Sequence, residues 1–463
     1  MRRHHAAVWD EPLIMEQGAP GRRGTVPPGP IDGSGVADLL PMGVARRTPP
    51  ELPEVAEPDV LRHYLRLSQE TMGMTGTRPN GRVVAEIAEI HPHQDDAGIQ
   101  GLLEVVHRVD LTLRELSGMD SFVFQDSDTT AAYLHASVTR AYFQARGELD
   151  RRRDVITTAH SHPRNAAAAA AAGFTVVTLP VEHDGYPSVD ALTAVVGDRT
   201  AALMVDNPDD TGIYNPHIKE WIDIVHEAGG LCCYDHADAN GVLGRVRVAE
   251  LGFDACTFLP HETVGAYGCS GMLAEYLPGP LVERTPDGYV RRENPGGVGR
   301  VQEFLGSLPQ VVQAYSWLVA MGADGLRAAA DISVLTTHYL KARLLAIPGV
   351  TTASDHGRTR FSLGEYTEET GVTAVDVRNR MTDFGIDACW LSREPWTVPP
   401  GWSVADVDHW IDVLAHVLDE GRRDPSLVRT APHDQVVARI RGDGPDDPAT
   451  WATTWRAHRR KNR

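Results

Sequence analysis

The stretch LCCYDHAD, residues 231–238, holds the pattern on which the fold assignment depends. Its apolar start, Leu231 to Tyr234, predicts a buried β-strand, and ionisable residues beginning with Asp235 follow that strand at once. Ligands of open α/β sheets bind at the carboxyl ends of the strands. Residues 235–238 are therefore the first candidates for a functional site.

Strands and helices alternate on both sides of this stretch. Strands are expected at 154–158, 174–179, 200–205 and 255–259, and helices at 166–172, before Gly173, and at 216–228. Such alternation predicts a mostly parallel sheet that is covered by helices on both faces. The fold class is thus α/β.

Composition divides the rest of the chain of 463 residues. We expect an N-terminal arm rich in Pro, Gly and Arg at 1–60, a large α/β domain at 61–300, a helical connection with a small α+β domain at 301–420, and a polar C-terminal extension at 421–463. Further helices are expected at 59–71, 98–117, 301–318, 325–345 and 404–418.

The net charge of −19 argues against nucleic acids and anionic membranes as partners, because both are polyanions. No apolar run is long enough to span a membrane, and no signal peptide is evident behind Arg2 and Arg3. The five cysteines form no CxxC pair, so neither a disulfide framework nor a structural zinc site is indicated. We expect a cytoplasmic protein.

Several short segments, taken in order, resemble the P-protein, the subunit of glycine decarboxylase that binds pyridoxal phosphate (PLP). They are Leu52-Pro53-Glu54-Val55, Arg62-His63-Tyr64, His91-Pro92-His93-Gln94-Asp95, Arg140-Ala141-Tyr142, Arg146-Gly147-Glu148, Tyr234-Asp235, Leu251-Gly252-Phe253-Asp254 and Gly299-Arg300-Val301. The resemblance covers roughly residues 10 to 420. It implies a fold-type-I PLP-transferase architecture and a close dimer.

The resemblance also assigns cofactor contacts. Asp235 takes the place of the aspartate that pairs with the pyridine nitrogen, and His160 that of the histidine that stacks on the ring. The phosphate loop, Gly-Ala-His-Gly-Glu in the family, aligns with Asp128-Thr129-Thr130-Ala131-Ala132. Cofactor binding is accordingly assigned to Asp235, His160, Thr129, Thr130 and Asp238.

Three departures from the family pattern affect this cofactor. The family's His-Lys-Thr is His261-Glu262-Thr263 here, and a glutamate cannot form the Schiff base that the lysine forms. Asp128 places a negative charge where phosphate would bind. A cysteine-containing loop expected near Met74 is replaced by a short connection. PLP is therefore doubtful, unless Lys219 or Lys341 lies within bonding reach of its aldehyde carbon.

Imidazoles and carboxylates gather at the predicted carboxyl ends of the strands instead. A divalent metal ion is one interpretation, because this ligand set suits iron, zinc or manganese; its candidate ligands are His160, His162, Asp235, His236, Asp238 and Glu262. Asp209 and Asp210 follow Asn207-Pro208 at another strand end, where a solvated turn is expected.

Three functions remain open. The first is an enzyme that handles a small amino acid, or a molecule derived from one, with Glu262 or His261 as general base and His160 in the site. The second keeps PLP, entering as an aldimine with the substrate. The third is a non-catalytic subunit that pairs with a paralogue carrying the lysine. A role in specialised biosynthesis is a further hypothesis for this divergent chain.

Overall fold

The computed structural model describes residues 94–182, 185–210, 213–236, 241–258, 266–301, 305–352, 361–384, 386 and 403–432. These residues form two compact units. The first runs to Asp331 and the second begins at Ile332.

The first unit is built around a seven-stranded sheet with the strand order β1-β7-β6-β5-β4-β2-β3. The strands are β1 Ser121–Phe124, β2 Asp154–Thr158, β3 Thr175–Leu179, β4 Thr200–Asp206, β5 Leu231–His236, β6 Ala255–Phe258 and β7 Ala266–Cys269. Strands β3, β2, β4, β5 and β6 are parallel, and β7 runs antiparallel to both β6 and β1. The expected mostly parallel sheet is confirmed.

The five strands expected from the sequence lie within two residues of their predicted bounds. Strands β2, β4, β5 and β6 are largely buried, whereas Leu179 is the one buried residue of β3, at the edge of the sheet. The thiols of Cys232, Cys233, Cys256 and Cys269 are free and buried in the sheet. Strands β4 and β5 both continue to an aspartate, which brings two carboxylates to the carboxyl edge of the sheet.

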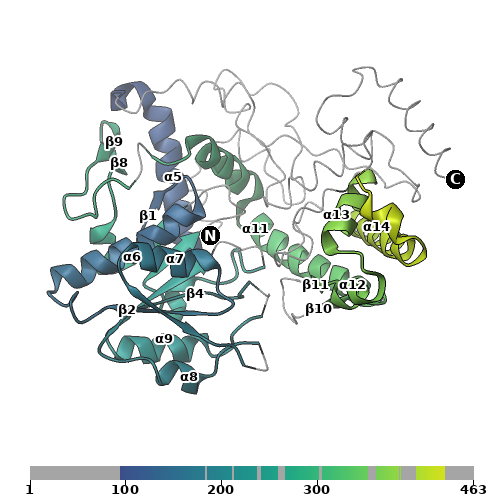
Figure 1. Ribbon diagram of the computed structural model, residues 1–463. Coiled ribbons are helices and arrows are strands. Elements are labelled where there is room, and N and C mark those ends of the chain that lie inside the picture. Colours follow the sequence, from purple (N-terminus) through teal and green to yellow (C-terminus); the bar gives the residue numbers. More distant parts are fainter. Residues whose placement is uncertain are drawn as a thin grey trace. The chain divides into compact units, whose positions relative to one another are not determined.

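Helices cover both faces of the sheet (Figure 1). Helices α6 Asp128–Ala145 and α7 Pro163–Ala171 pack on one face, while α9 Ile218–Glu227, with α8 Val189–Thr193 beside it, packs on the other. The core beneath α6 includes Leu134, Val138, Phe143, Met204 and Tyr267. Each helix that begins at the carboxyl edge therefore points its N-terminus toward the candidate site.

Smaller elements complete the first unit: η2 Asp96–Ile99, α5 Gln100–Ser117, α10 Val248–Leu251, η3 Gly271–Tyr276 and the hairpin of β8 Leu281–Thr285 with β9 Gly288–Arg292. The expected helix at 98–117 is confirmed as η2 and α5. The hairpin, which packs against α5, was not predicted.

Helix α11 spans Leu308–Leu345 and has one non-helical residue, Gly322. Its predicted start at Val301 is wrong, because Gly306 takes a left-handed conformation with φ +75°. A Cβ at Gly306 would lie 2.7 Å from the backbone of Phe124, so the chain turns closely against β1 before the helix can begin.

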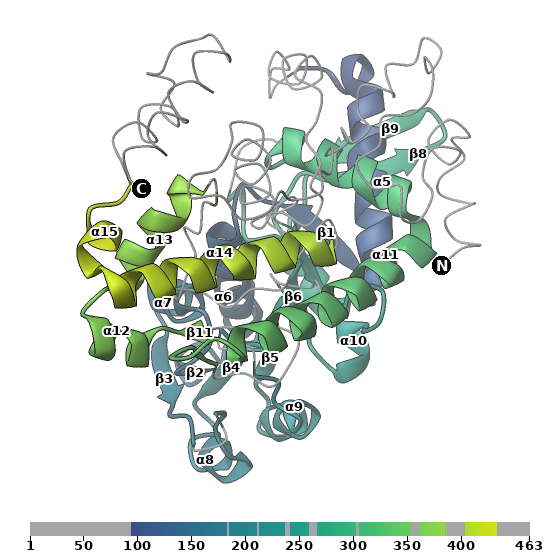
Figure 2. The ribbon, with the colours of Figure 1, turned by 90° about the vertical axis from the view of Figure 1, so that its right-hand side faces the viewer.

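The second unit contains β10 Thr351–Thr352, β11 Phe361–Ser362, α12 Gly364–Thr370, α13 Ala374–Asp383, α14 Val404–Arg423 and α15 Pro425–Arg429. Figure 2 shows α12, α13 and α15 around α14, against which each packs. The core includes Tyr366, Met381, Trp410, Leu414 and Val428. Residues 421–429, assigned from the sequence to a polar extension, thus contribute to this core. No helix among the described residues has the length and hydropathy needed to cross a bilayer.

Candidate functional site at the carboxyl edge of the sheet

Two aspartates lie side by side where β4 and β5 end. Asp206 and Asp235 are paired in the register of these parallel strands. Asp235 is buried, with 5% of its surface exposed. Two neighbouring carboxylates in a protein interior repel each other unless a cation or a proton compensates their charge.

Arg164, in the first turn of α7, supplies the compensating cation. Its Nε lies 2.6 Å from Asp235 Oδ2 and its Nη2 lies 3.2 Å from Asp235 Oδ1, which is a two-pronged ion pair. Its Nη1 lies 2.5 Å from Oδ2 of Asp128, at the start of α6. One guanidinium, 10% exposed, therefore connects the end of β5 to the N-terminus of α6.

This arrangement sets the protonation of the cluster. Burial alone would raise the pKa of Asp235, but the charge and hydrogen bonds of Arg164 outweigh it and lower that pKa, so Asp235 stays ionised. Burial raises the pKa of Asp206 well above its ordinary value, and the charge of Asp235 adds to the rise. Asp206 accepts from the backbone N–H of His162 and from the side-chain amide of Asn165, both at 2.6 Å.

The N-terminus of α6 carries the predicted phosphate-binding residues. Ser127 caps the helix by accepting from the Thr130 backbone N–H at 3.2 Å, and Asp128 Oδ1 accepts from the Thr129 backbone N–H at 2.7 Å. The Thr130 hydroxyl donates to Asp126 at 2.7 Å. The backbone N–H groups of Thr129 and Thr130 are thus already hydrogen-bonded to side chains of the chain itself.

The two histidines of His160-Ser161-His162 take different roles. His160, with its side chain 34% exposed, places Nδ1 3.7 Å from Oδ2 of Asp209. His162 is the N-cap of α7, where its Nδ1 accepts from the Arg164 backbone N–H at 3.2 Å. Asp209 is 7% exposed and accepts from the backbone N–H of Ile213, so the solvated turn expected there is wrong for this residue.

Several predicted site residues fall beyond what the structure describes. Asp238, His261 and Glu262 lie outside the described residues, as does the side chain of His236. Among the remaining predicted residues, Asp235 is joined through Arg164 to the α6 N-terminus that carries Thr129 and Thr130. His160 lies on the connection from β2 to α7, next to Asp209.

Sequence reasoning missed Arg164, Asp206 and Asn165. Arg164 follows the singled-out His162 by two residues, at the start of an expected helix, and that position was the available signal. Its partner Asp235 is 71 positions away, so no local pattern could reveal the pair.

The chain has three lysines, Lys219, Lys341 and Lys461. Lys219 lies on α9 with its side chain 57% exposed and paired with Asp223. Lys341 belongs to the second unit, and Lys461 lies outside the described residues. Within the first unit, therefore, no described lysine joins the cluster around Asp235.

Among the described residues, one group of three side chains could approach a metal ion, and it differs from the predicted set. His226, Cys232 and Asp254 gather at the amino end of β5, away from Asp235. Asp254 accepts from His226 at 2.9 Å and from the Cys232 backbone N–H at 2.7 Å. Burial raises the pKa of the Cys232 thiol well above its ordinary value, which opposes the thiolate form that binds metals.

Comparison with known proteins shows the family of this chain. Residues 122–274 match the family described as aminotransferase class-V. The probable glycine dehydrogenase (decarboxylating) subunit 2 of Pyrococcus horikoshii is 34% identical over 477 residues, covering 94% of each chain. The protein of the same name from Thermococcus gammatolerans is 35% identical over 474 residues, again covering 94% of each.

Among solved structures, the fold is similar to the crystal structure of glycine decarboxylase (P-protein) of the glycine cleavage system in inhibitor-bound form. The TM-score is 0.58 at 20% identity, covering 80% of this chain and 91% of that one. The expected PLP-transferase architecture is confirmed. With more than 30% identity to relatives across 94% of its length, the chain belongs to the family of glycine dehydrogenase (decarboxylating) subunit 2, the P-protein family.

Proposed function

We propose that this chain is an enzyme that uses the P-protein scaffold on a small amino acid, or a molecule derived from one, without a lysine Schiff base to PLP. The observation that supports the proposal best is the ion pair of Arg164 with Asp235 and Asp128. The name of these relatives, glycine dehydrogenase (decarboxylating), indicates glycine as the first substrate to test.

The described residues do not fit PLP well. The cofactor would need the Asp235 carboxylate for its ring nitrogen, but both oxygens of Asp235 are bound by Arg164. Its phosphate would need free backbone N–H groups at the α6 N-terminus, where Ser127 and Asp128 already accept them. Binding PLP would require these contacts to break and would leave a buried guanidinium without its partners.

Acid–base chemistry is the alternative that the site supports. In the pair of His160 and Asp209, Nδ1 and Oδ2 lie 3.7 Å apart, beyond hydrogen-bonding distance, so the carboxylate would have to move closer to orient the ring, while Nε2 would take a proton from the substrate. His261 and Glu262, which lie outside the described residues, are further candidates for the general base. A metal ion, if one is used, would draw on His160 with Asp238 and Glu262.

The first test is absorbance of the purified protein after incubation with PLP and glycine. We expect no aldimine band in the region of roughly 330–420 nm. A stoichiometric band would overturn the proposal and favour a PLP enzyme that works without lysine.

The second test is turnover. We expect NMR to detect conversion of glycine or one of its small derivatives by the native protein, and His160→Ala to abolish it. His162→Asn serves as the matched control and should retain activity. Elemental analysis of both variants and of Glu262→Ala tests for a metal ion.

A second candidate is a non-catalytic subunit that pairs with a lysine-bearing paralogue. The designation "subunit 2" in the name of the relatives favours this second candidate. Co-expression with such a paralogue separates the two: a stable complex in which His160→Ala leaves activity unchanged would support the subunit and exclude the enzyme.

A further inference from the structure

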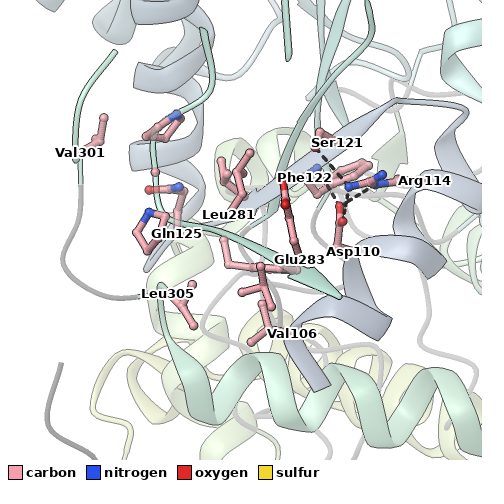
Figure 3. Close-up of a pocket in the computed structure, with 16 residues that line it drawn as sticks. Val106, Asp110, Arg114, Ser121, Phe122, Gln125, Leu281, Glu283, Val301 and Leu305 are labelled. Carbon is pink, nitrogen blue, oxygen red and sulfur yellow. Dashed lines mark hydrogen bonds and ion pairs between the residues drawn. The ribbon is translucent and has the colours of Figure 1, made fainter. Parts of the chain in front are cut away.

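A cavity of about 110 Å³ lies between α5, β1 and the start of β8 in the first unit (Figure 3). Its apolar walls include Val106, Phe124, Leu281 and Leu305. Its polar lining includes Gln125, Arg114 and Glu283. None of these residues belongs to the ion pairs of Arg164.

Gln125 provides the main indication of a ligand. It follows β1 directly, is 2% exposed, and lines the cavity. Its Oε1 is buried, and no described residue donates a hydrogen bond to it. A buried acceptor without a donor costs free energy, so a ligand that supplies an N–H group to Oε1 would remove that cost.

The charges of the lining favour a cation. Asp110 and Arg114 form a two-pronged pair, with Nε–Oδ1 at 3.0 Å and Nη2–Oδ2 at 2.5 Å, and so compensate each other. Asp110 also accepts from the Phe122 backbone N–H at 2.9 Å. Glu283 adds a second carboxylate, which leaves a formal charge of −1 from two acids and one arginine.

Glu283 is paired with Arg292, which lies 3.1 Å from Oε2 and 3.3 Å from Oε1. Because the side chain of Arg292 is 68% exposed and that of Glu283 is 40% exposed, water screens both charges. In Figure 3, Leu281 and Glu283 lie between Gln125 on one side and Arg114 on the other. Gln125, Glu283 and apolar side chains thus line the same small cavity.

We propose that this cavity binds a small organic ammonium ion with an aliphatic body. The ammonium group donates to Gln125 Oε1 and is attracted by Glu283, and the body packs on Val106, Phe124 and Leu281. The volume of about 110 Å³ suits about four or five non-hydrogen atoms, by comparison with cavities of about 150 Å³ that hold benzene. This site goes beyond the proposed function and does not depend on it.

Calorimetric titration of the full chain with n-butylamine, as its ammonium ion, in 150 mM NaCl tests the proposal. Butan-1-ol and butyrate serve as the uncharged and anionic probes. We expect n-butylammonium to bind at one site and the other two to bind more weakly. No binding at 20 mM, or tighter binding of butyrate, would overturn the assignment.

Variants locate the binding. Gln125→Leu should weaken n-butylammonium binding by about tenfold or more, because a hydrogen bond to a charged group is lost. Gln125→Glu should retain or tighten it, and Gln144→Leu, on the exposed surface of α6, should leave it unchanged.

If Gln125→Leu does not fold, Val301→Trp fills the cavity from a half-buried rim position and should abolish binding. Unchanged binding in folded Gln125→Leu or in Val301→Trp would show that the ligand binds elsewhere.

Discussion

Arg164 is the residue on which the charge balance of the site depends. A guanidinium suits this position because its planar donors can bind one carboxylate with two prongs and still reach a second. With Asp235 buried beside it, the arginine also determines which carboxylate is ionised: Asp235 stays charged, while the pKa of the neighbouring Asp206 is raised.

Arg164→Met should lower the free energy of unfolding by about 3–5 kcal/mol, because it leaves Asp235 buried and uncompensated. The double variant Arg164→Met with Asp235→Asn should recover part of that loss. Urea unfolding followed by circular dichroism measures both. Arg199→Met, which removes an exposed pair with Asp154, is the control and should change stability little. Equal losses in Arg164→Met and Arg199→Met would contradict the structural role of the buried pair.

At the scale of elements, strands β2 to β6 were predictable, whereas β1, β7 and the hairpin of β8 and β9 were not. The strands β2, β4 and β5 appear in the sequence as short apolar runs that leave few other interpretations. The sequence from Val301 onward carries apolar residues at helical spacing, yet α11 begins at Leu308, because Gly306 turns closely against Phe124. The contact between Gly306 and Phe124 joins segments far apart in the sequence, so a local sequence pattern could not predict it.

His162 was a candidate metal ligand from the sequence, and the structure places it at the N-cap of α7. As the N-cap, His162 accepts one hydrogen bond through Nδ1 from a backbone N–H of α7. His162→Ala should therefore cost about 1 kcal/mol of stability, and His162→Asn should restore it, because asparagine caps helices well.

Thermal unfolding of the two His162 variants, with elemental analysis of the same samples, provides the measurement. A metal ligand would behave differently: both variants would lose bound metal, and asparagine would not rescue the protein.

At the scale of the whole molecule, the family and fold class could be predicted from ordered motifs, whereas the side-chain partners at the site could not. Asp235 and the α6 N-terminus were named from the sequence, but the arginine that joins them was not. In the second unit, the ion pair of Glu420 with Arg380 predicts how the stability of the protein depends on pH.

In the second unit, Arg380 holds Glu420 with Nε–Oε2 at 2.8 Å and Nη2–Oε1 at 3.0 Å, and His416 lies 3.2 Å from Oε1. Burial alone would raise the pKa of Glu420, but the hydrogen bonds of His416 and Arg380 lower it from 4.5 to about 2. Because the folded pKa is depressed, the contribution of Glu420 to stability is complete above about pH 4.5 and is lost as the pH falls toward 2.

Native protein should therefore lose roughly 3 kcal/mol of stability over that range from this group, and Glu420→Gln should not. Urea midpoints of both proteins between pH 7 and pH 3 measure the difference. The gap between native and variant should narrow as the pH falls, and a gap that stays constant would refute the assignment.

Under the proposed function, the ion pair of Arg164 also bears on how easily a PLP site could arise in this chain during evolution. A chain with a lysine at position 262 would still have Arg164 bound to Asp235. Removing the arginine alone would leave the carboxylates of Asp235 and Asp128 without their cation. A PLP site would need coordinated changes at several positions, with less stable intermediates between them. Under the proposed function, descendants of this chain would therefore keep diverging from their PLP-binding ancestors sooner than revert to them.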